Sequence, residues 1–168
     1  MIKYIFLIVI FFYTSSYSEI VKKIIIDGNK RISDETIKVY GDISLNKDYN
    51  DISINKILKN LYTTNFFENV KVELSGGVLK VLVNEYPIVN SIQIQGEETK
   101  KVKEQIFKKL NLQINNAYTK ESLSQDIQII KKLYSSIGFN FVEIDTKIED
   151  LGSKRVNLYI FLNKGEKT

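Results

Sequence analysis

The sequence predicts an α+β protein made of two tandem β-α-α-β-β units, each a three-stranded mixed sheet covered on one face by two antiparallel helices. Two observations lead to this prediction. Short segments recur along the chain in the same order. Within each half, apolar residues are spaced by two, then by three or four, then by two again. The single proline, Pro87, stands between the halves, where its missing N–H suits a strand end or a short linker.

Three segments carry the repeat. They are Ile-x-Ile-x-Gly at 24–28 and 92–96, Leu-Tyr with two hydroxyl residues at 61–64 and 133–136, and an apolar run ending in Asn at 81–84 and 160–163. Their order is the same in both halves, which indicates a duplication with small loop insertions. We therefore expect one unit over residues 19–86 and a second over residues 87–168.

The first unit should contain three strands and two helices. The expected elements are a strand at 21–26, a short helix after 33, a helix around 54–62, and strands at 67–74 and 78–85. Ser33 or Asp34 is expected to cap the first helix, and Asp51 or Ser53 the second, after a loop at 49–51. Gly76-Gly77 predicts a tight hairpin turn between the last two strands.

The second unit repeats this order. The expected elements are a strand at 88–95, a helix at 97–110, a longer helix from 119 to 137, and strands at 139–149 and 155–162. Thr119 is expected to cap the longer helix, and Gly138 to end it. Tyr62 and Tyr134, which the sequence repeat pairs, are expected in the two cores with their hydroxyls at the rim.

This order of elements leaves the second strand of each unit at a sheet edge. If the two helices are antiparallel, the third strand runs parallel to the first and can pair with it between the first and the second. Unpaired N–H and C=O groups at an edge can bind an extended segment as an added strand. The candidate binding residues are Val70, Lys71, Val72, Glu73 and Leu74 in the first unit, and Val142, Glu143, Ile144, Asp145 and Thr146 in the second. The alternative is an ordinary exposed edge blunted by its charged side chains.

The composition excludes several kinds of site. The 168 residues include no Cys and no His, so a disulfide framework, a Cys- or His-ligated metal and a Ser-His-Asp triad are ruled out. Adjacent acids such as Glu97-Glu98 do not face one another across a cleft, so no catalytic residue, cofactor or metal is expected. The net charge of +4 is mild. The predicted helix–helix loops lack the Gly-x-x-Gly clamp of KH domains, so no nucleic acid is expected as a partner.

The first eighteen residues have the order of a secretory signal peptide. Lys3 lies before an apolar run at 4–13, and Ser16-Tyr17-Ser18 places small residues before a cleavage site at Glu19. The run is about half of the roughly 20 apolar residues that cross a membrane as a helix. We therefore expect residues 1–18 to be removed on export.

The two units resemble POTRA domains. The resemblance covers residues 19–166, and it is most specific at 61–72 in the first unit. In the second unit it is carried by Ala117-Tyr118, Leu123, Asp126-Ile127, Leu133-Tyr134 and Gly138-Phe139. The segment 27–32 also fits the first turn of the family. Single elements are weak signals, but their tandem order behind a signal peptide is specific.

The resemblance implies a function. It predicts the periplasmic region of an outer-membrane protein assembly factor in a Gram-negative bacterium. Such a region would bind unfolded outer-membrane proteins and the lipoproteins of the assembly complex, and would be joined to the membrane by a C-terminal β-barrel. This chain ends at Thr168 without a barrel, so we expect a fragment of a longer protein.

Other functions stay open at this stage. The alternatives are the POTRA region of a two-partner secretion transporter, a stand-alone periplasmic binding module, and a POTRA-bearing division protein. A carboxylate-based hydrolase has no positive support in the sequence.

Overall fold

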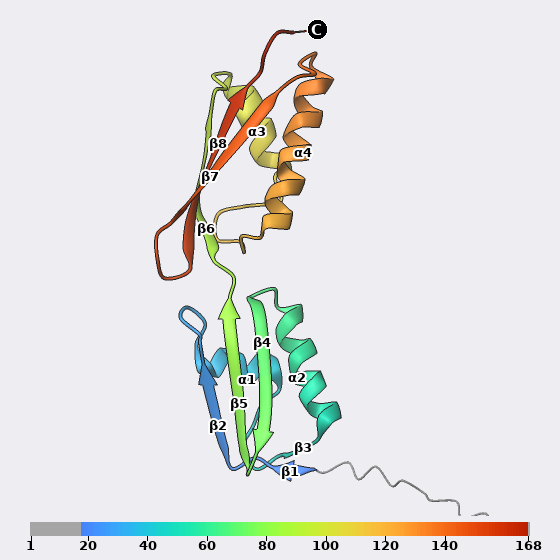
Figure 1. Cartoon of the computed structure of the whole chain (residues 1–168), viewed down its shortest axis with the longest axis vertical. Coiled ribbons are helices and arrows are strands. Elements are labelled where there is room, and N and C mark those ends of the chain that lie inside the picture. The colour runs from blue at the N-terminus through green and yellow to red at the C-terminus, as the bar shows by residue number, and fades with distance from the viewer. Residues whose placement is uncertain (1–17, 168) are drawn as a thin grey trace, which may run out of the picture.

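A computed structural model describes residues 18–167 and shows two bodies that follow one another along the long axis (Figure 1). Apart from Ser18, the expected signal peptide lies outside the described residues, and it stays a prediction. Within 18–167 no helix combines the length and the apolar character needed to cross a bilayer.

The first body holds seven elements. They are β1 (Glu19–Ile20), β2 (Lys23–Asp27), α1 (Asp34–Gly41), β3 (Asp48–Tyr49), α2 (Asp51–Thr63), β4 (Phe67–Ser75) and β5 (Val78–Glu85). Its main sheet has the order β2-β5-β4, with β2 parallel and β4 antiparallel to β5. The predicted β-α-α-β-β order and the mixed sheet are therefore confirmed.

The second body has the same topology. Its elements are β6 (Ile88–Gln95), α3 (Lys100–Lys109), α4 (Lys120–Ser136), β7 (Glu143–Asp150) and β8 (Arg155–Asn163). The sheet order is β6-β8-β7, again with the last strand in the centre and the middle strand at an edge. Only Tyr86 and Pro87 separate β5 from β6.

The glycine of the Ile-x-Ile-x-Gly repeat has one role in both bodies. Gly28 and Gly96 have φ of +88° and +82°, a region that side chains disfavour. A Cβ at Gly28 would overlap the carbonyl oxygen of Val83, and one at Gly96 that of Leu162. Each glycine thus lets the chain turn away from the first strand directly against the backbone of the central strand.

Helix starts agree with the sequence in part. Ser33 caps α1 and Thr119 caps α4, as predicted. The cap of α2 is Asn50, not Asp51 or Ser53, although the Ser53 hydroxyl accepts the Asn50 N–H and completes a capping box. The predicted loop at 49–51 is wrong at both ends, because Tyr49 belongs to β3, which pairs with β1, and Asp51 begins α2.

Burial corrects the pairing of the two tyrosines. Each helix ends two residues after a fully buried side chain, Leu61 in α2 and Tyr134 in α4. The position of Tyr62 therefore corresponds to Ser135, one residue away from the match of the letters. Tyr134 lies in the core as predicted, but its hydroxyl is buried against Glu97 and does not lie at the rim. Tyr62 is 43% exposed, so the prediction of a core position for it is wrong.

Candidate functional site at the sheet edges

The β4 edge exposes the backbone of alternate residues. Within the described residues β4 pairs only with β5. The two-residue turn at Gly76 and Gly77, both with positive φ, makes Ser75 and Val78 a hydrogen-bonded pair. Because antiparallel pairs alternate, the N–H and C=O groups of Val70, Val72 and Leu74 point away from β5.

The hydroxyl of Tyr62 covers the first of these positions. It accepts the Val70 N–H at 3.1 Å and lies 3.5 Å from the Val70 carbonyl oxygen. Tyr62 comes from the last turn of α2, which packs closely along β4. The outward groups of Val72 and Leu74 carry no such bond within 18–167.

Charged side chains follow the solvent face of β4. Lys71 and Glu73, both exposed, form an ion pair of 2.7 Å along the strand. The hydrogen bond from Lys71 and then its positive charge hold the pKa of Glu73 below its ordinary value. This pair blunts the edge, as the alternative view of an ordinary exposed edge expects.

The β7 edge differs from the β4 edge at its start. Val142 lies just before β7 and is buried in the core, so of the candidate residues in the second unit Glu143–Thr146 lie on the strand. At the hairpin, the Leu151 N–H donates to the Arg155 carbonyl at 3.0 Å. Alternation from that pair directs the backbone groups of Ile144, Thr146 and Ile148 away from β8.

Acidic side chains dominate the solvent face of β7. Glu143, Asp145 and Glu149 are exposed there, with Lys147 as the one cation among these four. Glu149 accepts hydrogen bonds from Asn157 at 3.0 Å and Tyr159 at 2.8 Å on β8, and these bonds lower its pKa. The β7 edge thus carries a net negative charge, whereas Lys71 and Glu73 on β4 balance.

The family of the second unit follows from its sequence. Residues 87–165 match the sequence model of the POTRA family, described as "Surface antigen variable number repeat". The second unit is a POTRA domain. The first unit has the same strand order and the same glycine against the central strand, and the predicted resemblance to POTRA domains is confirmed.

Similar proteins include outer-membrane assembly factors. The chain is 28% identical over 150 residues to the outer membrane protein assembly factor BamA of Neisseria meningitidis serogroup B, covering 87% of this chain and 19% of BamA. It is 27% identical over 82 residues to BamA of Neorickettsia risticii, covering 49% of this chain and 11% of that protein. The chain thus spans less than a fifth of the length of these relatives.

A solved structure is also similar. It is the N-terminal domain of Omp85 from the thermophilic cyanobacterium Thermosynechococcus elongatus, with 15% identity and a TM-score of 0.49. The match covers 86% of this chain and 63% of that one.

A buried carboxylate for which the sequence predicted no role lies in the POTRA domain. Glu97 is 3% exposed and accepts the Tyr134 hydroxyl at 2.5 Å and the Thr99 N–H at 2.8 Å, with Lys164 at 3.5 Å. Burial raises the pKa of Glu97, but these hydrogen bonds and the Lys164 charge outweigh it and lower the pKa to about 2. The predicted helix at 97–110 therefore begins later, at Lys100, because Glu97 turns inward to hold Tyr134.

A second buried carboxylate, Glu85, ends β5 in the first unit. One oxygen accepts the N–H groups of Lys30, Arg31 and Ile32 at 2.8–2.9 Å, and the other lies 3.6 Å from Arg31 Nε. Burial raises the pKa of Glu85, and the three backbone bonds together with Arg31 lower it below its ordinary value. Like Glu97, Glu85 is committed to holding a loop and is not free to act as an acid or a base.

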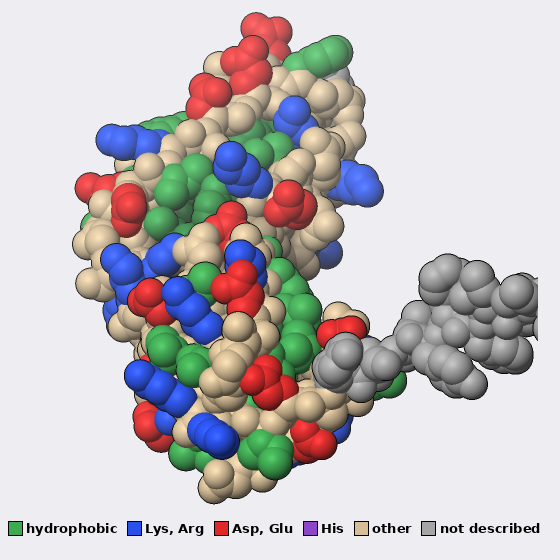
Figure 2. Space-filling model, turned by 60° about the horizontal axis from the view of Figure 1, so that its bottom comes forward, with side chains coloured by type: hydrophobic (Ala, Val, Ile, Leu, Met, Phe, Trp, Pro, Cys, Tyr) green, Lys and Arg blue, Asp and Glu red, His purple; other side chains and the backbone are tan. Residues whose placement is uncertain are grey.

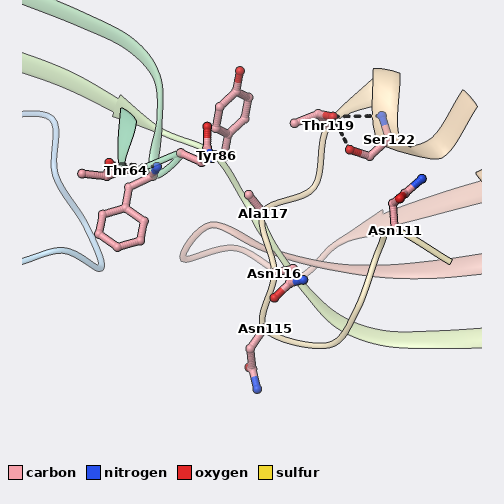
Figure 3. Close-up of a pocket in the computed structure, with 10 residues that line it drawn as sticks. Thr64, Tyr86, Asn111, Asn115, Asn116, Ala117, Thr119 and Ser122 are labelled. Carbon is pink, nitrogen blue, oxygen red and sulfur yellow. Dashed lines mark hydrogen bonds between the residues drawn. The ribbon is translucent and has the colours of Figure 1, made fainter. Parts of the chain in front are cut away.

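The POTRA domain meets the first unit around a polar hollow of about 540 Å³ (Figure 3). Thr64 and Tyr86 line one side, and Asn116, Ala117 and Thr119 the other. The lining side chains include no Lys, Arg, Asp or Glu. Beside the hollow, Lys154 Nζ donates to Asn84 Oδ1 at 2.6 Å and joins the two units.

The opposite sheet edges are less open or shorter. The start of β6 is covered by the loop before α4, since Val89 donates to the Asn116 carbonyl and accepts from the Asn115 N–H. The other edge strand, β2, has five residues. No group of three or more acidic side chains that could hold a metal ion occurs within 18–167.

Proposed function

We propose that this chain is the periplasmic POTRA region of an outer-membrane protein assembly factor. It binds unfolded outer-membrane proteins by adding an extended segment of the client to a sheet edge, and it contacts partner lipoproteins of the assembly complex. The observation that carries the proposal is the row of outward-facing N–H and C=O groups on β4 and β7. The similarity to BamA over most of the chain supports the same role.

Backbone recognition suits this role because main-chain hydrogen bonds do not depend on side-chain identity. A client strand of an outer-membrane barrel alternates apolar and polar residues. Next to β4 or β7 it would place its apolar residues beside Val72, Leu74, Ile144 and Ile148. These positions lie on the helix-covered face, where the two edges keep partly exposed apolar side chains.

The test removes the outward donor of both edges at once. A double variant, Val72→Pro with Thr146→Pro, lacks one outward N–H on each edge. The backbone hydrogen bonds of β4 to β5 and of β7 to β8 are kept, because the two N–H groups point away from those strands. The matched control is Val72→Gly with Thr146→Gly, which loses the same side chains but keeps both N–H groups.

Binding is measured by fluorescence anisotropy with a labelled peptide of about ten residues copied from an outer-membrane barrel strand. The proline pair should weaken binding by roughly tenfold or more relative to the glycine pair. Circular dichroism would check that both variants stay folded. Equal affinity of the two folded variants would refute strand addition.

A further inference from the structure

The two edges differ in whether a side chain already occupies them. On β4, the Tyr62 hydroxyl takes the outward N–H of Val70 and lies near its C=O. A strand added to β4 would have to displace this hydroxyl to make its bonds at Val70. What stays open on β4 is the backbone of Val72 and Leu74, next to the hairpin turn.

The second unit has no equivalent of this tyrosine. Ser135 stands at the corresponding position of α4, and its hydroxyl bonds Asn140 at 2.6 Å. The tyrosine beside it, Tyr134, points into the core and bonds Glu97. Its hydroxyl therefore donates to Glu97, 37 residues earlier in the sequence, and is not available to the β7 edge.

The backbone of β7 is correspondingly open. Within 18–167 the outward N–H and C=O groups of Ile144, Thr146 and Ile148 accept or donate no side-chain bond. The approach of α4 to β7 is also much sparser than that of α2 to β4. An added strand can therefore run along three successive outward-facing residues without displacing a side chain.

The charge of the β7 edge selects the occupant. An added strand places every second side chain on the solvent face, where the nearest neighbours are Glu143, Asp145 and Glu149, with Lys147 between them. Directly opposed side chains lie about 5 Å apart, and opposite charges there are favourable. Charges of both signs are interspersed over the face seen in Figure 2.

We propose that Tyr62, by holding the Val70 backbone, blocks strand addition along β4 and that extended segments with basic residues at alternate positions dock on β7. This inference rests on the proposed function, because it names which edge is used and what its occupant looks like. Tyr62 acts as a specificity-determining residue. It occupies the Val70 backbone of the first unit, so that the extended segment binds to the second unit.

Charge is tested first with two peptides of about ten residues, one alternating Val with Lys and one alternating Val with Glu. The Lys peptide should bind the wild-type chain roughly tenfold more tightly at low salt, and the difference should shrink as salt screens it. Thr146→Pro should weaken binding of the Lys peptide relative to Thr146→Gly. Equal binding of the two peptides, or loss in Val72→Pro instead of Thr146→Pro, would overturn the choice of β7.

The closing role of Tyr62 is tested with Tyr62→Phe, which keeps the ring and removes the hydroxyl. The amide of Val70 should exchange with solvent faster, and the barrel-strand peptide should bind at two sites per chain in place of one. Adding Val72→Pro should remove the second site. The matched control is Tyr40→Phe, another half-exposed tyrosine of the first unit, which should change neither quantity.

The outcomes separate the two proposals. A single site in Tyr62→Phe despite a fast-exchanging Val70 amide would overturn the closing role and leave strand addition intact. A protected Val70 amide in that variant would overturn it as well. If the double proline variant of the previous section binds peptide like its glycine control, both proposals fall.

Discussion

The strongest prediction concerns Glu97, whose charge should stabilise the second unit in a pH-dependent way. The change is Glu97→Gln, which keeps the size of the side chain and removes its charge. A pKa of about 2 in the folded state, against the ordinary 4.5, corresponds to about 3 kcal/mol of stability. Because the folded pKa is the lower one, this contribution is complete above about pH 4.5 and disappears as the pH falls toward about 2.

Urea unfolding followed by circular dichroism measures the effect. At about pH 7 the variant should unfold with about 3 kcal/mol less free energy than the wild type, and the gap should narrow steadily below about pH 4.5. The exposed neighbour supplies the control, since Glu98→Gln should have little effect at either pH. A gap that stays constant down to about pH 3 would refute the electrostatic reasoning.

Two further predictions concern stability in each unit and use the same urea assay. Gly96→Ala should lose about 3 kcal/mol or more, because its Cβ would overlap the Leu162 carbonyl, whereas Gly152→Ala, with open space around it, should lose only about 1 kcal/mol for its positive φ. Similar losses in the two variants would argue against the overlap. Glu85→Ala should lose about 3 kcal/mol, since three backbone N–H groups lose their acceptor, while the exposed Glu104→Ala should be near neutral. A loss in Glu85→Ala below about 1 kcal/mol would show that water replaces the carboxylate.

The topology was predictable because it depends on direction and periodicity. With antiparallel helices between the first and second strands, the third strand runs parallel to the first and can pair between the first and the second, which is the position that β5 and β8 take. The alternating pattern of β4 and the Gly76-Gly77 turn then set the pairing. These signals are local in the sequence, so a single chain displays them.

The ends of helices were less predictable. Asn50 caps α2 although Asp51 and Ser53 are equally good capping residues. The cap is the extended residue that follows the short strand β3, and that residue is Asn50. The sequence predicted Glu97 in the first turn of a helix. In the structure its carboxylate lies in the core, because the buried Tyr134 hydroxyl needs an acceptor.

The candidate site could be predicted only as far as the strands that carry it. The sequence located Val70–Leu74 and most of the second segment on edge strands, and their role in binding stays a prediction. It could not show that Tyr62 bonds the Val70 backbone. That contact crosses the corner between a helix and a strand, and no spacing rule describes it.

By itself, the sequence determined that there are two similar units, the order of their strands and helices, and the absence of Cys and His chemistry. Only the tertiary structure showed that two tyrosines aligned by the repeat differ: one hydroxyl is buried in the core and the other bonds the backbone of an edge strand. A shift of one residue rotates a helical side chain by about 100°, which turns Tyr134 into the core and Tyr62 onto the edge of β4. The sequence therefore does not show that the β4 edge is partly covered by Tyr62 while the β7 edge is open.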